Sequence, residues 1–297
     1  MTMHIDGRKL ARRIEDAVAS EVASLAERSG RVPGLATVLV GDDPASAVYV
    51  ARKRAAVRKA GMRDLHRSLP AHASHDDIAA VIDELAATPE VSGILLQLPL
   101  PAGVEARPLI DRIPAVKDVD GLTTESVGLL AGRADGLRPC TPSGVIEILD
   151  SEGIAIKGAH AVVVGASDLV GRPMAQLLLQ RDATVTIAHR RTTDLAAVTR
   201  AADILVVATG VPGLIGPEHV KHGATVIDVG ITRTPTGLTG DVRTEELDGI
   251  AGRITPVPGG VGPMTIAMLL ANTLKAALTQ DRTTSSLSLS AAQPTRP

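Results

Sequence analysis

Three polar side chains lie on one face of a predicted helix near the N-terminus. Asp43-Pro44 follows an apolar stretch and predicts a helix start, with Asp43 as the N-cap and Pro44 in the first turn. Within that helix, Ser46, Tyr49 and Lys53 are spaced three and then four residues apart, which places a hydroxyl, a phenol and an amine on the same side. The spacing predicts that these groups converge on one ligand.

Lys53 is the candidate for proton transfer. The chain has 7 lysines among 31 basic residues, and it keeps this one between Arg52 and Arg54. Arginine stays protonated at neutral pH, whereas burial and nearby cations both lower the pKa of a lysine. We therefore expect an amine that exchanges protons, and the alternative is a solvated basic helix face. Tyr49, the only aromatic residue of the chain, carries less weight by itself.

A further polar position interrupts an apolar segment. Gln97 lies near the end of residues 91–101, whose apolar run is typical of a buried parallel strand. Open parallel sheets bind ligands at the carboxyl ends of their strands, so we expect this amide at a ligand site. The alternative is a core glutamine whose hydrogen bonds are satisfied internally.

The second half of the chain has the pattern of a dinucleotide site. An apolar strand at residues 160–164 leads into a glycine-containing turn, a helix and a second strand at residues 184–188. The glycine spacing departs from G-x-G-x-x-G, so the interpretation depends on the order of strand, turn, helix and strand. Arg190 and Arg191 follow the second strand, where an acidic residue would select NAD, and they favour the 2′-phosphate of NADP. An exposed basic loop is the alternative.

Two later apolar strands complete this pattern. They lie at residues 203–208 and 224–229, and they end in Thr209-Gly210 and Gly230-Ile231. In a doubly wound sheet, the loops at these strand ends are expected to flank the nicotinamide.

Composition favours small-molecule partners. The net charge of −2 gives no general attraction to nucleic acid or to an anionic membrane. The single cysteine excludes an intramolecular disulfide and is typical of a reducing compartment, and the N-terminus is charged where a signal peptide is apolar. Residues 255–274 carry no charge, but prolines and glycines leave only residues 264–274 as continuous apolar helix, which is too short to span a membrane. We expect a soluble, cytoplasmic protein.

Histidine and cysteine positions do not predict a metal site. The pairs His72/His75 and His219/His222 have helical spacing but no third ligand nearby. Cys140 lies between two prolines, and we interpret it as a small apolar core residue.

The order of predicted elements indicates an α/β protein. A chain of 297 residues is long enough for about two domains. Predicted helices lie at residues 7–29, from Pro44 to Gly61, after the capping-box sequence Ser74-x-x-Asp77, and at 139–151 inside a connector at 121–158; further strands lie at 34–40 and 63–69. This alternation predicts layers of helices on parallel sheets, the second of them Rossmann-like and doubly wound.

Several motifs together resemble the bifunctional methylenetetrahydrofolate dehydrogenase/methenyltetrahydrofolate cyclohydrolase family. The resemblance runs from residue 4 to about residue 279, and the set is specific although no single motif is. The motifs are Gly41-Asp-Asp-Pro-Ala-Ser46 with Tyr49-Val-x-x-Lys53, Gln97-Leu-Pro-Leu-Pro101, Lys117-Asp-Val-Asp-Gly121, Pro139-Cys-Thr-Pro142, Gly165-x-Ser-x-x-Val-Gly-Arg-Pro173, Asp228-Val-Gly-Ile231 and Pro258-Gly-Gly-Val-Gly-Pro-Met-Thr265.

The resemblance implies oxidation of 5,10-methylenetetrahydrofolate with NADP, then hydrolysis of 5,10-methenyltetrahydrofolate to 10-formyltetrahydrofolate. It implies that Lys53 is the catalytic lysine, that Tyr49 lies near the folate, that Gln97 tunes the lysine and that Asp120 holds the pterin. Without it, Asp120 is equally an ordinary turn aspartate. It further implies substrate contacts at Pro258, Gly259 and Gly260 and dinucleotide contacts at Gly165, Ala166, Ser167, Arg190 and Ile231, to which the basic pair adds Arg191.

The family also implies two α/β domains flanking a cleft and a homodimer. We expect residues 1–121 to form the catalytic folate-binding domain, completed by the C-terminal helix 264–279. Residues 122–263 are expected to form the NADP-binding domain, and the polar tail 281–297 to be disordered. Ala166 stands where some members carry an arginine for the 2′-phosphate, and Arg190 or Arg191 is expected to offset its loss.

Two other functions fit part of the pattern. A shikimate-type dehydrogenase shares the two-domain plan, and a catalytically silent protein would bind a dinucleotide without turnover. The intact set of Tyr49, Lys53, Gln97 and Asp120 argues against a silent protein.

Overall fold

The computed structural model describes residues 1–235 and 237–291, with side chains as far as Arg282. The chain divides into two compact units: unit 1 contains Met1–Ile14, Leu129–Ala134 and Pro139–Met268, and unit 2 contains Glu15–Gly128, Asp135–Arg138 and the chain from Leu269 onward. Helices α1 (Gly7–Ser29) and α9 (Val261–Ala291) each contribute residues to both units. The first residues of the chain therefore belong to unit 1.

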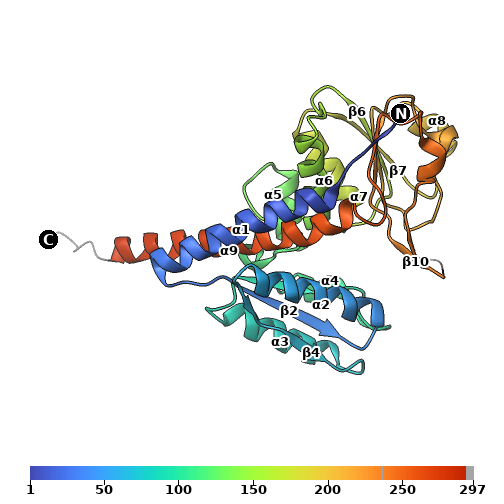
Figure 1. Ribbon diagram of the computed structural model, residues 1–297. Helices are drawn as coiled ribbons and strands as arrows, with labels where there is room; N and C mark the ends of the chain where they lie inside the picture. Colours follow the sequence, from blue (N-terminus) through green and yellow to red (C-terminus); the bar gives the residue numbers. More distant parts are fainter. Residues whose placement is uncertain (236, 292–297) are drawn as a thin grey trace. The chain divides into compact units, whose positions relative to one another are not determined.

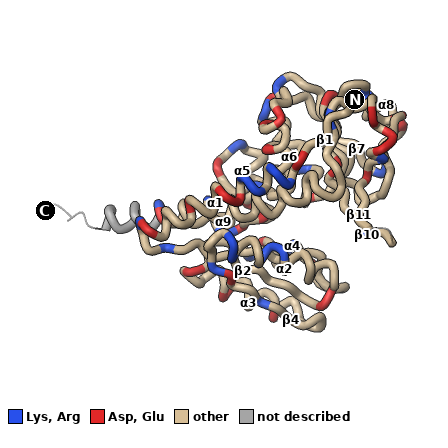
Figure 2. Tube along the Cα trace, in the orientation of Figure 1, with Lys and Arg blue, Asp and Glu red and all other residues tan. Residues whose placement is uncertain are grey.

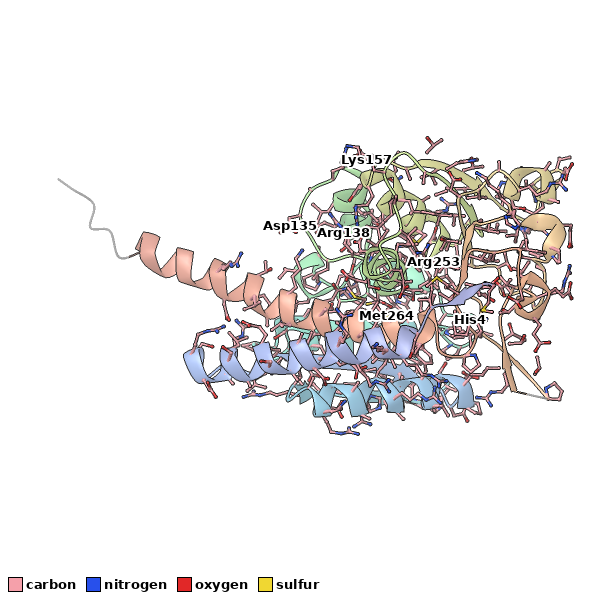
Figure 3. All side chains as sticks on the ribbon, turned by 45° about the horizontal axis from the view of Figure 1, so that its top comes forward. His4, Asp135, Arg138, Lys157, Arg253 and Met264 are labelled. Atoms are coloured by element: carbon pink, nitrogen blue, oxygen red, sulfur yellow. The ribbon has the colours of Figure 1, made fainter. Side chains whose placement is uncertain are left out.

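Unit 1 is built on a parallel sheet of six strands in the order β1-β12-β9-β8-β6-β7. The strands are β1 (Met3–His4), β6 (His160–Val164), β7 (Thr184–Ala188), β8 (Ile204–Val207), β9 (Thr225–Asp228) and β12 (Arg253–Ile254). The apolar runs of β6, β8 and β9 are typical of strands buried on both faces. Figure 3 labels His4 and Arg253 on the paired strands β1 and β12. Because every pairing is parallel, all six carboxyl ends lie at one edge.

Helices cover both faces of this sheet (Figure 1). One face packs against α6 (Cys140–Ser151), α7 (Gly171–Gln180) and the unit 1 parts of α1 and α9. The opposite face packs against residues of α8 (Leu195–Thr199) and of the 3₁₀ helix Thr244–Leu247. Unit 1 is therefore the doubly wound, Rossmann-like layer structure that the sequence predicts. Its remaining elements are the antiparallel pair β10 (Thr232–Thr234) and β11 (Gly237–Thr239) and the 3₁₀ helix Pro217–His219.

Unit 2 contains a smaller parallel sheet around β2 (Gly34–Val40). One edge of β2 pairs with β3 (Arg63–Asp64) and β4 (Arg67–Leu69), and the other pairs with β5 (Gly93–Leu96). The prediction of one continuous strand at residues 63–69 is wrong, because two short strands lie there. The ladder breaks at Leu65 and His66, where Nδ1 of the His66 ring donates to the Thr37 carbonyl at 3.0 Å.

Further helices belong wholly or partly to unit 2. α2 (Pro44–Lys59) packs on β2, and α3 (His75–Ala87) packs on β2 and β5. α3 begins with the predicted capping box, in which Ser74 Oγ accepts from the Asp77 backbone at 3.1 Å and Asp77 accepts from the Ser74 backbone at 2.9 Å. The predicted helix 7–29 and strand 34–40 are confirmed. The other helices are α4 (Ala106–Ile110) and α5 (Thr124–Ala131), with the 3₁₀ helix Ala115–Lys117; α5 lies in the stretch predicted as a connector.

The C-terminal segment differs from the expected disordered tail. Helix α9 continues to Ala291, and residues 292–297 lie outside the described part of the chain. Up to Asp281 the helix is held by contacts within unit 2, because Asp281 pairs with Arg31 and Gln280 Nε2 donates to the Ser92 carbonyl at 2.8 Å.

Helix α9 is also longer at its start than expected. It begins at Val261, because Gly262 and Pro263 fit a first turn whose N–H groups need no helical acceptor. By length and composition, Val261–Arg282 is long enough to cross a membrane, but 56% of its most apolar window is buried inside the protein, as in a core helix. Acidic and basic residues are interspersed along the chain of both units (Figure 2).

Substitution of Gly93 tests the close approach that places the turn at residues 118–121 beside β5. A Cβ at Gly93 would lie 2.2 Å from Cγ1 of Val119, so we expect Gly93→Ala to lower the free energy of unfolding by about 1–3 kcal/mol. Urea denaturation of wild type, both single alanine variants and the Gly93→Ala/Val119→Ala double variant measures the coupling. The double variant should lose less than the sum of the single losses, and strict additivity would contradict the contact.

Candidate functional site

An amine, an amide and a phenol meet in unit 2. Lys53 Nζ donates to Oε1 of Gln97 at 3.1 Å and lies 5.1 Å from the centroid of the Tyr49 ring. Lys53 is only 6% exposed, although lysine is rarely buried. Gln97 Nε2 donates to the Leu98 carbonyl at 2.6 Å, which orients the amide with its oxygen toward the amine. The structure brings together three of the four residues predicted as the catalytic set.

The start of α2 and the end of β5 position these groups. Asp43 Oδ2 accepts from the Ser46 backbone at 2.7 Å, which confirms the predicted N-cap. The backbone N–H and then the hydroxyl of Ser46 lower the pKa of Asp43. Tyr49 and Lys53 are four residues apart and therefore neighbours on one face of α2. Gln97 directly follows β5, at the carboxyl edge of the sheet.

The arginines beside Lys53 have other surroundings. Arg54 Nε donates to both carboxylate oxygens of Asp64, at 3.1 and 3.0 Å. Arg52 is exposed. Asp64 therefore offsets the charge of Arg54, and the effect of the two flanking cations on the pKa of Lys53 stays a prediction. Burial, the other cause that the sequence indicates, is observed.

Asp120 belongs to a turn next to β5. Ile94 and Asp118 form a parallel bridge, so the chain runs from Asp118 toward the edge that carries Gln97. Asp118 is buried and its Oδ2 accepts from the Thr123 backbone at 2.8 Å. Asp118 therefore forms a turn contact, and Asp120 is half-buried two residues later. Both roles expected of Asp120 stay predictions.

Close backbone contacts shape the glycine loop of unit 1. Gly165 follows β6 with a φ of 121°, and a Cβ there would lie 2.2 Å from the Ala208 carbonyl oxygen. A Cβ at Gly171 would lie 2.0 Å from the carbonyl oxygen of Gly165. Only glycine fits both positions. Ala166 and Ser167 occupy the loop between them, ahead of the α7 N-terminus, which is the position that binds phosphate in a dinucleotide fold.

Arg190 and Arg191 lie in a turn after β7. The backbone of Thr192 donates to the His189 carbonyl at 2.8 Å and closes this turn. Both arginines are exposed, and neither forms an ion pair within residues 1–235 and 237–282. Their charges are available to an anion from solvent.

The first turn of α9 lies near Ile231. A Cβ at Gly262 would lie 3.1 Å from Ile231 Cδ1, and Ile231 is 46% exposed. In the segment just before α9, Gly259 has a φ of 118°, and the Gly260 backbone donates to the Pro256 carbonyl at 2.8 Å. The predicted substrate segment therefore leads directly into the helix start that lies near Ile231, the predicted dinucleotide residue. A cavity of about 360 Å³ opens beside this segment, lined by His4, Ile5, Asp6, Arg8, Arg12, Pro256, Pro258 and Gly259.

Sequence reasoning missed a pair of buried aspartates at this edge. Asp228 ends β9 and is 1% exposed, and Asp241 is 0% exposed. Burial raises the pKa of Asp228 to about 7, against hydrogen bonds from the backbones of Asp241, Val242 and Gly230 that lower it. The sequence does contain a signal for Asp228, because this carboxylate comes directly after the apolar residues of the buried strand β9.

Metal ligation finds no support in the part of the chain that the structure describes, where no group of three His, Cys, Asp or Glu side chains is arranged to hold an ion. His219 Nδ1 accepts from the Gly216 backbone at 3.3 Å. Cys140 is buried at the start of α6.

Two family models together match most of the chain. The catalytic-domain model of tetrahydrofolate dehydrogenase/cyclohydrolase matches residues 5–120, and the NAD(P)-binding-domain model of the same family matches residues 139–281. The bifunctional protein FolD 2 of Frankia casuarinae is 63% identical over 273 residues, which is 92% of this chain and 95% of the relative.

Solved structures show the same similarity. The FolD methylenetetrahydrofolate dehydrogenase/cyclohydrolase of Campylobacter jejuni is 41% identical with a TM-score of 0.92, and the match covers 94% of this chain and 100% of that one. The Trypanosoma brucei enzyme, complexed with NADP cofactor and inhibitor, is 39% identical with a TM-score of 0.91 over 95% and 99% of the two chains.

The raised pKa of Asp228 predicts how stability depends on pH. The folded protein keeps a proton that the unfolded chain, with a pKa near 3.8, releases. This contribution to stability is complete below about pH 4 and is lost as the pH rises through about 7, on the order of 1 kcal/mol per pH unit. Asp228→Asn does not titrate, so between about pH 5 and 7 the unfolding temperature of wild type should fall relative to that of the variant. Calorimetry at several pH values measures this difference, and a constant difference would contradict the assignment.

Proposed function

Because the chain belongs to the tetrahydrofolate dehydrogenase/cyclohydrolase family, we propose that it oxidises 5,10-methylenetetrahydrofolate with NADP and hydrolyses the product to 10-formyltetrahydrofolate. The observation that carries the second step is the buried amine of Lys53, hydrogen-bonded to Gln97 and next to Tyr49. The first step needs mainly two ligands held in register, since N5 and N10 stabilise the cation that hydride loss creates.

Ring opening requires proton transfers, and Lys53 is placed to make them. Water adds to the methenyl carbon and loses a proton to the amine, which gives a carbinol. The ammonium then donates that proton to N5 as the bond from carbon to N5 breaks, and the carbinol hydroxyl releases its proton to solvent, which leaves the formyl group on N10. Burial favours the neutral form of an amine, which can accept the first proton. Gln97 holds the amine through a neutral oxygen, and Tyr49 offers a ring face to the ammonium form at cation–π distance.

Asp120 is proposed to hold the pterin. A carboxylate accepts two hydrogen bonds side by side, which matches the paired donors of the pterin amino group and N3–H. Pro258, Gly259 and Gly260 are proposed to contact the substrate, in the segment that leads into α9, where Gly262 lies near Ile231.

NADP fits the residues of unit 1. The close-packed glycines leave Gly165, Ala166 and Ser167 to receive the phosphates, and the two exposed arginines offer cations for a 2′-phosphate. When bound, the nicotinamide supplies the hydride acceptor. The T. brucei relative binds NADP, which supports the same choice here.

We also propose how the chain divides into functional parts. We place the catalytic, folate-binding part in residues 1–121 with the C-terminal helix, and the NADP-binding part in residues 122–263. The matched segments of the two family models agree with this order along the chain. A homodimer and a cytoplasmic location belong to the same proposal.

Substitution of Lys53 tests the proton-transfer role. Lys53→Met should reduce hydrolysis of methenyltetrahydrofolate at least 100-fold, because general acid–base groups contribute about 10²–10⁴. The absorbance of the methenyl compound reports its formation and its decay separately. Lys59→Met is a matched control, since Lys59 is exposed at the end of the same helix. Normal hydrolysis by folded Lys53→Met protein would exclude the role.

Arginine substitutions test the cofactor assignment. Arg190→Ala/Arg191→Ala should lower kcat/KM for NADP by about 10-fold or more and leave kcat/KM for NAD unchanged, because each lost charged hydrogen bond costs about 1.5–3 kcal/mol. Arg200→Ala, at the exposed end of α8, is the control. If the ratio of kcat/KM for NADP to kcat/KM for NAD did not change, the 2′-phosphate would bind elsewhere.

A further inference from the structure

The two buried aspartates of unit 1 connect the loops that follow β8 and β9. Asp241 Oδ2 accepts from the Thr209 backbone at 2.6 Å, from the Thr209 hydroxyl at 2.9 Å and from the Gly210 backbone at 2.9 Å. The backbone of Asp241 in turn donates to Asp228 Oδ1 at 3.1 Å, and the same oxygen accepts from the Gly230 backbone at 2.9 Å. One continuous network therefore runs from the end of β8 to the end of β9.

The network reaches two further segments. Asp228 Oδ2 accepts from the Val242 backbone at 3.0 Å, and the Asp228 backbone donates to Oγ1 of Thr255 at 2.8 Å. Thr255 directly precedes residues 256–260, which lead into α9, where Gly262 lies near Ile231. The two carboxyl groups thus fix three stretches of chain at the carboxyl edge of the sheet, and the backbone of Asp228 holds a fourth.

Both carboxyl groups are packed without a balancing cation. Within residues 1–235 and 237–282, neither aspartate forms an ion pair, and Oδ1 of Asp241 has no hydrogen-bond partner. A Cβ at Gly230 would lie 2.1 Å from that oxygen, and a Cβ at Gly240 would lie 1.9 Å from Asp228 Oδ2. Burial of an unbalanced carboxyl pair costs free energy, which a purely structural turn can avoid by using neutral side chains. The arrangement therefore calls for a role beyond closing the loops.

We propose that Asp241 and Asp228 are positioning residues for the nicotinamide end of the dinucleotide. They act through the backbone of Thr209-Gly210 and Gly230-Ile231, the two loops that end β8 and β9 at the edge where a doubly wound sheet binds its cofactor. The proposal rests on the function proposed above, since it assumes NADP at this edge. Hydride transfer depends on placement of the ring, so loosened loops affect oxidation and leave hydrolysis, which needs no cofactor, unaffected.

Comparison of Asp241→Ala with Asp241→Asn separates two properties of the Asp241 side chain, its hydrogen-bond acceptor and its negative charge. Both variants are neutral, but only alanine leaves the three donors of Thr209 and Gly210 without an acceptor. We expect Asp241→Ala to weaken NADPH binding at least 10-fold and to raise KM for NADP. The fluorescence of NADPH measures its binding. Asp241→Asn should stay within about threefold of wild type, because its amide oxygen can accept the same bonds.

The cyclohydrolase rate without cofactor is the internal control. It should stay within about twofold of wild type in both variants, because Lys53 and Gln97 lie in unit 2. Unchanged NADPH affinity in Asp241→Ala overturns the inference, and so does a parallel loss of cofactor binding and cyclohydrolase activity, which indicates general destabilisation.

Gly230→Ala provides a second route if Asp241→Ala does not fold. It retains both carboxyl groups but pushes Asp241 Oδ1 out of place, so the same selective loss of cofactor binding is expected, and normal binding overturns the inference. Failure of the proposed function is distinct from these outcomes, because wild-type protein would then not oxidise methylenetetrahydrofolate at all.

Discussion

The proposed chemistry depends on one buried amine that is held by a neutral partner. Gln97 accepts from Lys53 through an amide oxygen, and its own NH₂ group is engaged by the Leu98 carbonyl, so the amide cannot turn its donors toward the lysine without losing a bond. A carboxylate in the place of Gln97 would stabilise the ammonium form and hold the proton. An amide accepts a hydrogen bond from the amine in either protonation state. The choice of glutamine therefore suits a group that must both accept and donate a proton.

Parallel sheets bring these residues together from distant parts of the sequence. In unit 2, β5 ends at Gln97, and the bridge from Ile94 to Asp118 directs the following turn to the same edge. In unit 1, the glycine loop after β6 and the loops after β8 and β9 share the carboxyl edge of the six-stranded sheet. Glycines make this possible where backbones approach too closely for a Cβ, as at Gly165 against the Ala208 carbonyl. The positions of the sites thus follow from strand direction and from a few steric constraints.

Local signals in the sequence predicted much of this arrangement. The Asp43-Pro44 start of α2 and the capping box at Ser74 depend on side chains within one helical turn, and both are present. The tertiary environment was harder to predict. The pairing of Arg54 with Asp64 joins residues ten positions apart on two elements, and the burial of Asp241 depends on loops that lie far apart in sequence. The ion pair of Asp281 with Arg31 likewise joins residues 250 positions apart, which composition alone does not reveal.

The two proposed chemical steps make different demands on the chain. Hydride transfer requires placement, and unit 1 offers close-packed glycines, a hydrogen-bonded turn after β7 and loops fixed by buried carboxyl groups. The proposed ring opening requires a group that changes its protonation state, and unit 2 offers a single amine whose end is restrained by one amide and one ring. A cofactor held by flexible side chains would lose its register. The restraints in unit 1 and unit 2 therefore match the chemistry that is proposed for each.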